Sequence, residues 1–224
     1  MTLALATSLA HACAGVADGT VILHGSLALG GYRPGRSDID LLLVTPRALS
    51  HSQVSALREL DGPLDLHVIA ASVAAHPTPA PPVELYAGHA EFTIGVPSDP
   101  DVIAELSVAR AHGISLIGPP PASVIGPVPP EWVRSRARHW LRRWLTLTDD
   151  ASHAAFMVLT ACRMWRFAAE GVHSPKTEAA RWALTQDPSL SAIRQAMLGY
   201  ETGAVTPIEP AGIARVLEAA LRNT

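Results

Sequence analysis

The composition of this chain excludes several classes of protein before any motif is considered. Its 224 residues suffice for one large domain or two small ones, and a hydrophobic content of 48% is ample for a core. The net charge is −3, whereas a protein that binds long nucleic acid normally carries a basic surface. We therefore expect no nucleic acid as a partner, and a small cationic molecule suits the mild acidity better.

The N-terminal segment and the cysteines bear on where the protein works. Residues 1–16 are apolar and alanine-rich but have no positive n-region, so we interpret them as an amphipathic helix rather than a signal peptide. No stretch reaches the roughly 18 unbroken apolar residues of a membrane span. Cys13 and Cys162, the only cysteines, suit buried thiols in a reducing cytosol. We expect a cytoplasmic monomer without a membrane partner.

The segment from residue 23 to residue 44, LHGSLALGGYRPGRSDIDLLLV, combines a Gly-Ser turn with two closely spaced acids. On a strand, Asp38 and Asp40 share one face, and two such carboxylates repel each other unless a cation such as Mg²⁺ lies between them. Gly25 and Ser26 offer a backbone that can approach phosphates closely. A lone D-x-D pair is often two solvated turn acids, but this order and spacing predict metal-dependent nucleotidyl transfer.

The same residues resemble the G-S…D-x-D signature of the DNA polymerase β nucleotidyltransferase superfamily. More narrowly, the LHGS–GG–P–SDIDLLV run is similar to that of the bacterial adenylyltransferases that modify streptomycin and spectinomycin. The resemblance implies that ATP is a co-substrate and that Gly25, Ser26 and Ser37 hold its phosphates. It also implies that Asp38 and Asp40 bind Mg²⁺, and that AMP passes to a hydroxyl of a small cationic antibiotic while pyrophosphate leaves.

Residues 64–69 alternate as a strand does and contain Asp65. In the superfamily a third acid commonly lies on the strand beside the D-x-D strand. Asp65 could therefore complete a three-carboxylate metal cluster with Asp38 and Asp40. The other interpretation is an aspartate at a strand edge that faces solvent.

The proline-rich residues 76–82 predict a loop that delivers Glu84. Residues 84–88, ELYAG, resemble the E-L-x-x-G segment of the streptomycin and spectinomycin enzymes, which implies that Glu84 is the general base for the acceptor hydroxyl. A hydroxyl is a weak nucleophile, so a carboxylate within hydrogen-bond reach is what this chemistry needs. Glu91 and Asp65 are the chemical alternatives.

Residues 119–130 contain so many prolines that we place a domain boundary there, near residue 125. We expect residues 1–125 to form an α/β nucleotidyltransferase domain, with a mixed sheet backed by helices. Residues 126–224 are expected to form an all-α helical bundle. Arginines alternate with tryptophans over residues 131–148, and we favour a helix with a buried aromatic face over a nucleic-acid surface.

Arg163 interrupts the most apolar of the expected helices, residues 154–170. The surrounding block resembles the family pattern L-T-x-x-R-x-W…G…P-K…A-A-x-W-A, which implies that Arg163 and Lys176 reach the nucleotide phosphates. A guanidinium fork and a lysine charge suit a triphosphate. The alternatives are a structural ion pair for Arg163 and a solvated lysine at a helix start for Lys176.

Trp144 and Asp149 fall where the same family has a tryptophan and an aspartate that grip the guanidinium-bearing part of streptomycin. An aromatic face and a carboxylate both suit a cation. The chain departs from the family at His153, where an acid is expected. Two other functions stay open: adenylylation of another small hydroxylated molecule or of a protein, and a non-catalytic nucleotide-binding or toxin–antitoxin module.

Overall fold

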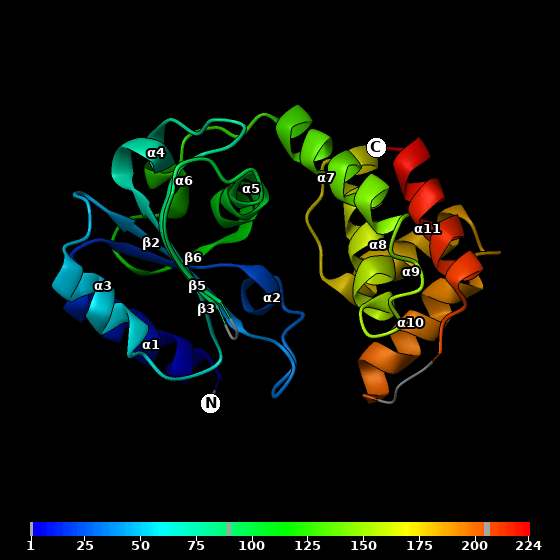
Figure 1. Ribbon diagram of the computed structural model, residues 1–224, viewed down its shortest axis with the longest axis horizontal. Helices are drawn as coiled ribbons and strands as arrows, with labels where there is room; N and C mark the ends of the chain where they lie inside the picture. Colours follow the sequence, from blue (N-terminus) through cyan, green and yellow to red (C-terminus); the bar gives the residue numbers. More distant parts are fainter. Residues whose placement is uncertain (1, 89–90, 204–206) are drawn as a thin grey trace. The chain divides into compact units, whose positions relative to one another are not determined.

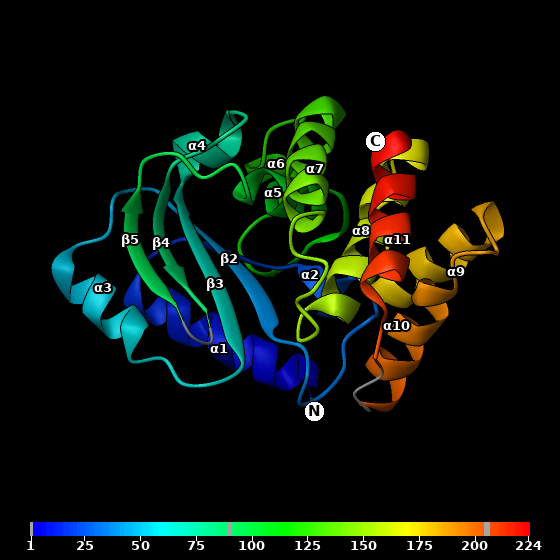
Figure 2. The ribbon, with the colours of Figure 1, turned by 45° about the vertical axis from the view of Figure 1, so that its right-hand side comes forward.

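The chain folds into two compact units, Met1–Pro129 and Pro130–Thr224. They are seen in a computed structural model that describes residues 2–88, 91–203 and 207–224 (Figure 1). The first unit is a sheet with helices on both faces, and the second consists of helices (Figures 1 and 2). The expected fold class, a mixed sheet with helices followed by a helical part, is thereby confirmed. None of the described helices is long and apolar enough to cross a membrane.

The first unit has a six-stranded sheet in the order β5-β4-β3-β2-β1-β6. Its strands are β1 (Thr20–Leu23), β2 (Ile39–Thr45), β3 (Leu64–Ala70), β4 (Val83–Ala87), β5 (Phe92–Val96) and β6 (Ile114–Ile117). The central strands β2 and β3 run parallel, and each other neighbouring pair runs antiparallel. β2 is an almost unbroken apolar run because both faces of a central strand are covered.

Two apolar layers enclose this sheet. Helices α1 (Thr2–Val16) and α3 (His51–Arg58) pack on one face, where they cover Leu41 and Leu43 of β2. Helices α4 (Ala71–Ala75), α5 (Val102–His112) and α6 (Pro121–Val124) belong to the other face, where Leu42 of β2 lies. Because side chains alternate along a strand, Asp40 points to the same face as Leu42, the face of α5.

The proline-rich residues 76–82 form a connection without helix or strand, as expected, between the end of α4 at Ala75 and the start of β4 at Val83. Glu84 lies on β4, and Val83–Ala87 and Phe92–Val96 pair as an antiparallel hairpin, β4 and β5, at the edge of the sheet. The connection between these strands contains glycine and alanine but no recognisable two-residue turn signal, so the sequence does not reveal this hairpin.

The second unit is built around α8 (Ala154–Glu170), which packs against α7 (Pro130–Trp144), α9 (Lys176–Gln186), α10 (Ser191–Thr202) and α11 (Pro210–Arg222). Figure 2 shows these helices in one group. Met157, Leu159 and Cys162 of α8 are buried in a core of leucine, isoleucine, valine and alanine side chains. The expected helical second part is therefore confirmed, and α8, the most apolar of the expected helices, lies at its centre.

Candidate active site

Asp40 and Asp65 lie directly opposite each other on the parallel strands β2 and β3. Paired residues of adjacent strands point to the same face of a sheet, so both carboxylates belong to the α5 face. Both line a cavity of about 530 Å³. Burial is the main cause that raises the pKa of Asp65 to about 6, and the charge of Asp40 adds to this effect. The two carboxylates are therefore close together, partly buried and mutually repulsive.

The Gly-Ser turn is tied to the second aspartate of the D-x-D pair. Residues Gly25–Ala28 form a single helical turn, α2, and the backbone N–H of Ser26 donates to Oδ2 of Asp40 over 3.1 Å. Gly25 has φ 59°, and a Cβ there would lie 2.0 Å from Oδ2 of Asp40. Only glycine permits this close approach. The hydroxyl of Ser26 is buried and has no hydrogen-bond partner among the described residues, so it fits a ligand oxygen.

Asp38 and Ser37 precede β2 in the loop that leads to the site. The Asp38 side chain is exposed, and its charge contributes to a raised pKa of Tyr86, so the two side chains lie in the same area. The hydroxyl of Ser37 accepts a hydrogen bond from the backbone N–H of Arg33 over 3.1 Å. The Ser37 side chain therefore stabilises the loop that precedes Asp38.

Asp65 has two close polar neighbours on the same face. The hydroxyl of Tyr86, on β4, donates to Oδ2 of Asp65 over 3.2 Å. Nδ1 of His67, two residues further along β3, lies 3.6 Å from Oδ1. Burial lowers the pKa of His67, although the carboxylates of Glu105 and Asp65 oppose this shift. The alternation of β3 could have revealed His67 from the sequence, whereas Tyr86 depends on the pairing of β3 with β4.

His24, directly before the Gly-Ser turn, is a buried titratable side chain that sequence reasoning missed. Its Nδ1 lies 3.3 Å from Oε2 of Glu105 on α5, and the His24 side chain is 2% exposed. Burial alone would lower the pKa of His24, but the hydrogen bond and charge of Glu105, with the charges of Asp40 and Asp65, outweigh it and raise the pKa. The carboxylates around His24 thus favour its protonated form.

Glu84 is not brought to the aspartates. Its Oε2 accepts a hydrogen bond from the backbone N–H of Leu49 over 2.9 Å, and Leu49 follows the end of β2, whereas Asp40 lies near its beginning. In the β3–β4 pairing, Tyr86 lies opposite His67, so Glu84 lies beyond the pairs nearest Asp65. The two chemical alternatives for the base, Asp65 and Glu91, both line the cavity instead.

The residues described hold no group of three or more His, Cys, Asp or Glu side chains that could enclose a metal ion. The three-carboxylate cluster of Asp38, Asp40 and Asp65 stays a prediction; Tyr86 donates to the Asp65 carboxylate and His67 lies beside it. Asp38 and Asp40 nevertheless fit Mg²⁺, which is commonly held by one or two carboxylates together with phosphate oxygens.

The cavity beside Asp40 and Asp65 is acidic. Six carboxylates line it: Asp40, Asp65, Glu91, Asp99, Asp101 and Glu105. Thr93, Ser98 and Tyr86 add hydroxyl groups. A polar, acidic cavity favours a cationic ligand that carries hydroxyl groups over an apolar or anionic one.

In the helical unit, Lys176 lies between two aromatic rings. Its Nζ is 5.0 Å from the centre of the Phe156 ring and 5.7 Å from that of Tyr200. Arg163 is half-buried on α8, seven residues after Phe156, so both lie on one side of that helix. Lys176 thus lies beside Phe156, whereas Arg163 lies about two helical turns further along α8.

Trp144 and Asp149 are placed differently from each other. Trp144 is 7% exposed, belongs to the bundle core, stacks on Trp140 and meets Phe156 edge to face. Its ring is therefore occupied by packing, which makes it a weaker candidate for a ligand contact than the family resemblance implied. Asp149 is exposed in the turn after α7.

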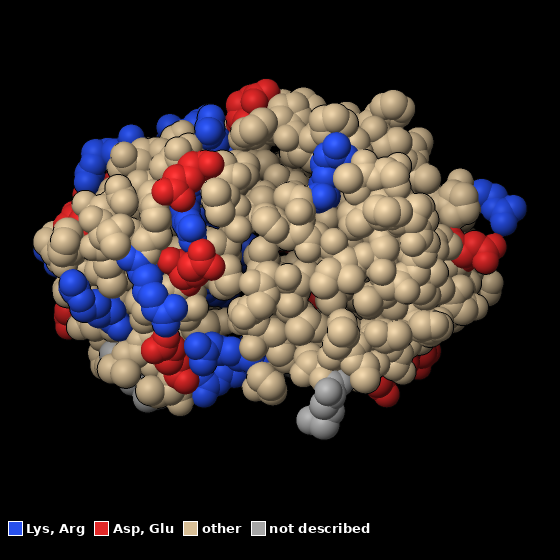
Figure 3. All heavy atoms as spheres, turned by 180° about the vertical axis from the view of Figure 1, so that it is seen from behind, with Lys and Arg blue, Asp and Glu red and all other residues tan. Residues whose placement is uncertain are grey.

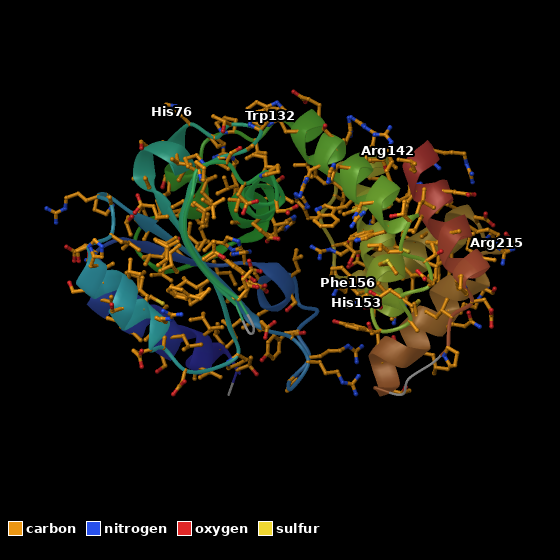
Figure 4. All side chains as sticks on the ribbon, in the orientation of Figure 1. His76, Trp132, Arg142, His153, Phe156 and Arg215 are labelled. Carbon is orange, nitrogen blue, oxygen red and sulfur yellow. The ribbon has the colours of Figure 1, made fainter. Side chains whose placement is uncertain are left out.

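His153, where the chain departs from the family, contacts Asp150 in the same turn. Nδ1 of His153 lies 2.7 Å from Oδ2 of Asp150. Hydrogen bonds from Ser152 and then His153 lower the pKa of Asp150 to about 2. Figure 4 shows His153 and Phe156 side by side at the start of α8. On the face shown in Figure 3, Lys and Arg side chains lie among Asp and Glu side chains rather than in one continuous basic area.

A mixed sheet that sets a Gly-Ser turn against paired aspartates, followed by a helical unit, defines a nucleotidyltransferase. Residues 11–73 match the family described as nucleotidyltransferase domain, and residues 123–220 match the C-terminal domain of aminoglycoside adenylyltransferase. The two matches cover the Gly-Ser turn with its aspartates and most of the helical unit, so both parts of the chain contribute to the assignment.

Two curated relatives and one solved structure agree with these matches. An Escherichia coli aminoglycoside (3'') (9) adenylyltransferase is 28% identical over 81% of this chain and 78% of its own length. A Staphylococcus aureus spectinomycin 9-adenylyltransferase is 31% identical over 73% of this chain and 70% of its own. Spectinomycin adenyltransferase AAD(9) from Enterococcus faecialis, solved with ATP and spectinomycin, shares the fold, with a TM-score of 0.71, 16% identity and 92% of each chain covered. The chain belongs to the aminoglycoside adenylyltransferase family.

Proposed function

We propose that this enzyme transfers AMP from ATP to a hydroxyl of an aminoglycoside or aminocyclitol antibiotic, spectinomycin or streptomycin, with Mg²⁺ as cofactor and pyrophosphate as product. The observation that carries the proposal is the placement of Asp40 opposite Asp65 in an acidic cavity, with the Gly-Ser turn held against Asp40. The names of the relatives and the ATP and spectinomycin in the similar structure support it. We expect a monomer acting in the cytoplasm, where ATP is present.

Asp38 and Asp40 are the residues that would hold Mg²⁺. When bound, such an ion polarises the phosphate that is attacked and neutralises charge on the departing pyrophosphate. The N–H of Ser26 orients the Asp40 carboxylate, and the buried Ser26 hydroxyl is placed to bond a phosphate oxygen. Gly25 keeps the turn close to Asp40, and Ser37 supports the loop that carries Asp38.

Arg163 and Lys176 are proposed to supply positive charge to the phosphates. Charged hydrogen bonds of this kind are about twice as strong as neutral ones, and they matter most where negative charge develops during the reaction. The rings of Phe156 and Tyr200 beside Lys176 hold its ammonium group in a defined place, which favours a lysine with a fixed task over a freely solvated one.

Asp65 is the best-placed general base. The acceptor oxygen attacks the α-phosphorus of ATP, the bond from that phosphorus to the pyrophosphate oxygen breaks, and the hydroxyl proton passes to Asp65. A pKa of about 6 leaves Asp65 ionised at neutral pH and still basic enough to take a proton. Glu91, on the same cavity, is the second candidate, whereas Glu84 is held by Leu49.

The acceptor is proposed to lie in the acidic cavity, where Asp99, Asp101 and Glu91 can face its ammonium groups. Exposed Asp149 remains a candidate contact for the guanidinium groups of streptomycin. Trp144 is packed in the core and His153 replaces an acid, so we expect spectinomycin to be the better substrate.

Purified protein incubated with ATP, Mg²⁺ and either antibiotic should release pyrophosphate and yield an antibiotic that carries AMP, detected by mass spectrometry. Omitting the antibiotic is the control for ATP hydrolysis. Release with neither spectinomycin nor streptomycin would reject the antibiotic as acceptor. Adenylylation of another hydroxylated molecule under the same conditions would keep the nucleotidyl transfer and change only the acceptor.

A further inference from the structure

The carboxylate of Asp65 accepts a hydrogen bond at one oxygen and has an imidazole packed beside the other, both from side chains that the nucleotidyl-transfer motif does not include. The Tyr86 hydroxyl donates to Oδ2 over 3.2 Å, and Nδ1 of His67 lies 3.6 Å from Oδ1. His67 and Tyr86 face each other across the β3–β4 pairing, and their rings lie 4.7 Å apart at an angle of 40°. The three side chains form one packed group on the wall of the cavity.

Gly88 gives the Tyr86 hydroxyl the space that it occupies. A Cβ at residue 88 would lie 2.3 Å from the Tyr86 hydroxyl oxygen and 2.8 Å from its Cζ, both shorter than atoms tolerate. The backbone of Gly88 does not require glycine, because its φ is not in the left-handed region. The glycine is therefore explained by the position of the Tyr86 hydroxyl rather than by the turn.

Asp65 needs such support because Asp40 lies opposite it. Two carboxylates on one face repel each other, and an unsupported side chain would rotate away from its neighbour. A general base is effective only when its oxygen is held within hydrogen-bond reach of the hydroxyl that it deprotonates. One hydrogen bond from Tyr86 and a packed imidazole at the other oxygen restrict that rotation.

We propose that Tyr86 and His67 are positioning residues that hold Asp65 in the orientation in which it takes the proton of the acceptor hydroxyl. The inference rests on the proposed function and adds to it. It predicts that both side chains act on the rate of transfer through Asp65, and not on the binding of ATP or of the antibiotic.

The test measures kcat and KM for ATP and for spectinomycin in Y86F, H67L and H67N, with thermal unfolding as a check that each variant folds. Y86F should lower kcat about tenfold, the change in rate that corresponds to one lost hydrogen bond, and leave both KM values within about twofold. H67L, which removes the polar ring beside Oδ1, should also lower kcat at unchanged KM. H67N should lower kcat less than H67L, because the asparagine amide keeps a polar group beside Oδ1. I94A is the matched control: Ile94 lies next to Thr93 on the same strand, its side chain is exposed and it does not line the cavity, so we expect no effect on kcat.

A double-mutant cycle separates positioning from an independent contribution. In a D65N background the Y86F change should cost little further rate, because the group that Tyr86 positions is already lost. Full additivity, an unchanged kcat in Y86F, or a rise in the KM for spectinomycin at constant kcat would overturn the proposal. A wild-type enzyme that transfers AMP to no antibiotic would refute the proposed function instead, so the two failures are distinguishable.

Discussion

The backbone N–H of Ser26 donates to the carboxylate of Asp40, so the Gly-Ser turn and the D-x-D strand form one unit although they lie apart in the sequence. Gly25 stands at the point of closest approach, since its Cβ position falls 2.0 Å from Oδ2 of Asp40. Any side chain at residue 25 would displace the carboxylate that the proposed mechanism uses.

Replacing Gly25 with alanine should therefore abolish adenylyl transfer. The left-handed φ alone costs roughly 1–2 kcal/mol for a residue with a Cβ, and the clash with Asp40 adds to it. G30A is the control, because Gly30 also has a left-handed φ but has open space around its Cβ position. Steady-state rates and thermal unfolding of both variants check the prediction; equal rate losses would contradict it.

The raised pKa of Asp65 predicts how activity depends on pH. Transfer needs the ionised carboxylate, so kcat/KM, which reports the free enzyme, should fall as the pH drops through about 6. A profile of kcat/KM against pH for the wild-type enzyme measures this limb. A profile that stays flat down to pH 4 would show that Asp65 is not the base.

The raised pKa of Asp65 also predicts that the free energy of unfolding falls as the pH rises, whereas the activity rises. The folded protein binds the Asp65 proton more tightly than the unfolded chain, in which the pKa is near the ordinary 3.8. This contribution is fully present below pH 3.8 and is lost as the pH rises through about 6, at most about 3 kcal/mol. Urea unfolding of the wild type and of D65N across this range should show the loss in the wild type alone.

Glu84 and Asp65 should respond differently to removal of their charge. E84Q should keep most of the activity and lose about 1 kcal/mol of stability, because the Glu84 carboxylate accepts the N–H of Leu49. D65N should lower kcat by about 10² to 10⁴, the usual contribution of a general base. If E84Q is inactive and D65N is active, the assignment of the base reverses.

The ion pair of His24 and Glu105 should contribute mainly to stability. E105L leaves the buried His24 ring without its carboxylate, and we expect a loss of about 1–3 kcal/mol in urea unfolding. E105Q, which keeps a hydrogen-bond acceptor, is the matched variant and should lose less. Equal stability of E105L and the wild type would show that the pair contributes nothing to the fold.

Lys176 is expected to act on ATP binding. K176M should raise the KM for ATP by about tenfold, because the loss of one charge-assisted hydrogen bond to a phosphate weakens binding by about that factor. R181M is the control, because Arg181 lies on the same helix α9 and its loss removes the same charge, but it pairs with Glu201. A similar rise in both variants would indicate a general effect of net charge.

The sequence alone could assign those features that depend only on residues close to one another along the chain. Strand alternation places Asp40 and the apolar residues of β2 without knowledge of any neighbour, whereas Asp38, expected on the same strand, lies in the loop before it. The apolar spacing of α8 likewise identifies the centre of the helical unit. Together with the resemblance carried by these segments, local pattern was enough for the fold class and the family.

Tertiary structure decided which acid stands beside Asp40. The parallel register of β2 and β3 brings Asp65 opposite Asp40, and register depends on contacts between segments that no local pattern contains. Glu84 shows the converse: its motif suggested a base, yet the pairing of β4 directs its carboxylate to Leu49. Trp144, chosen for its aromatic face, is packed into the core because burial is decided by the neighbours that the fold supplies.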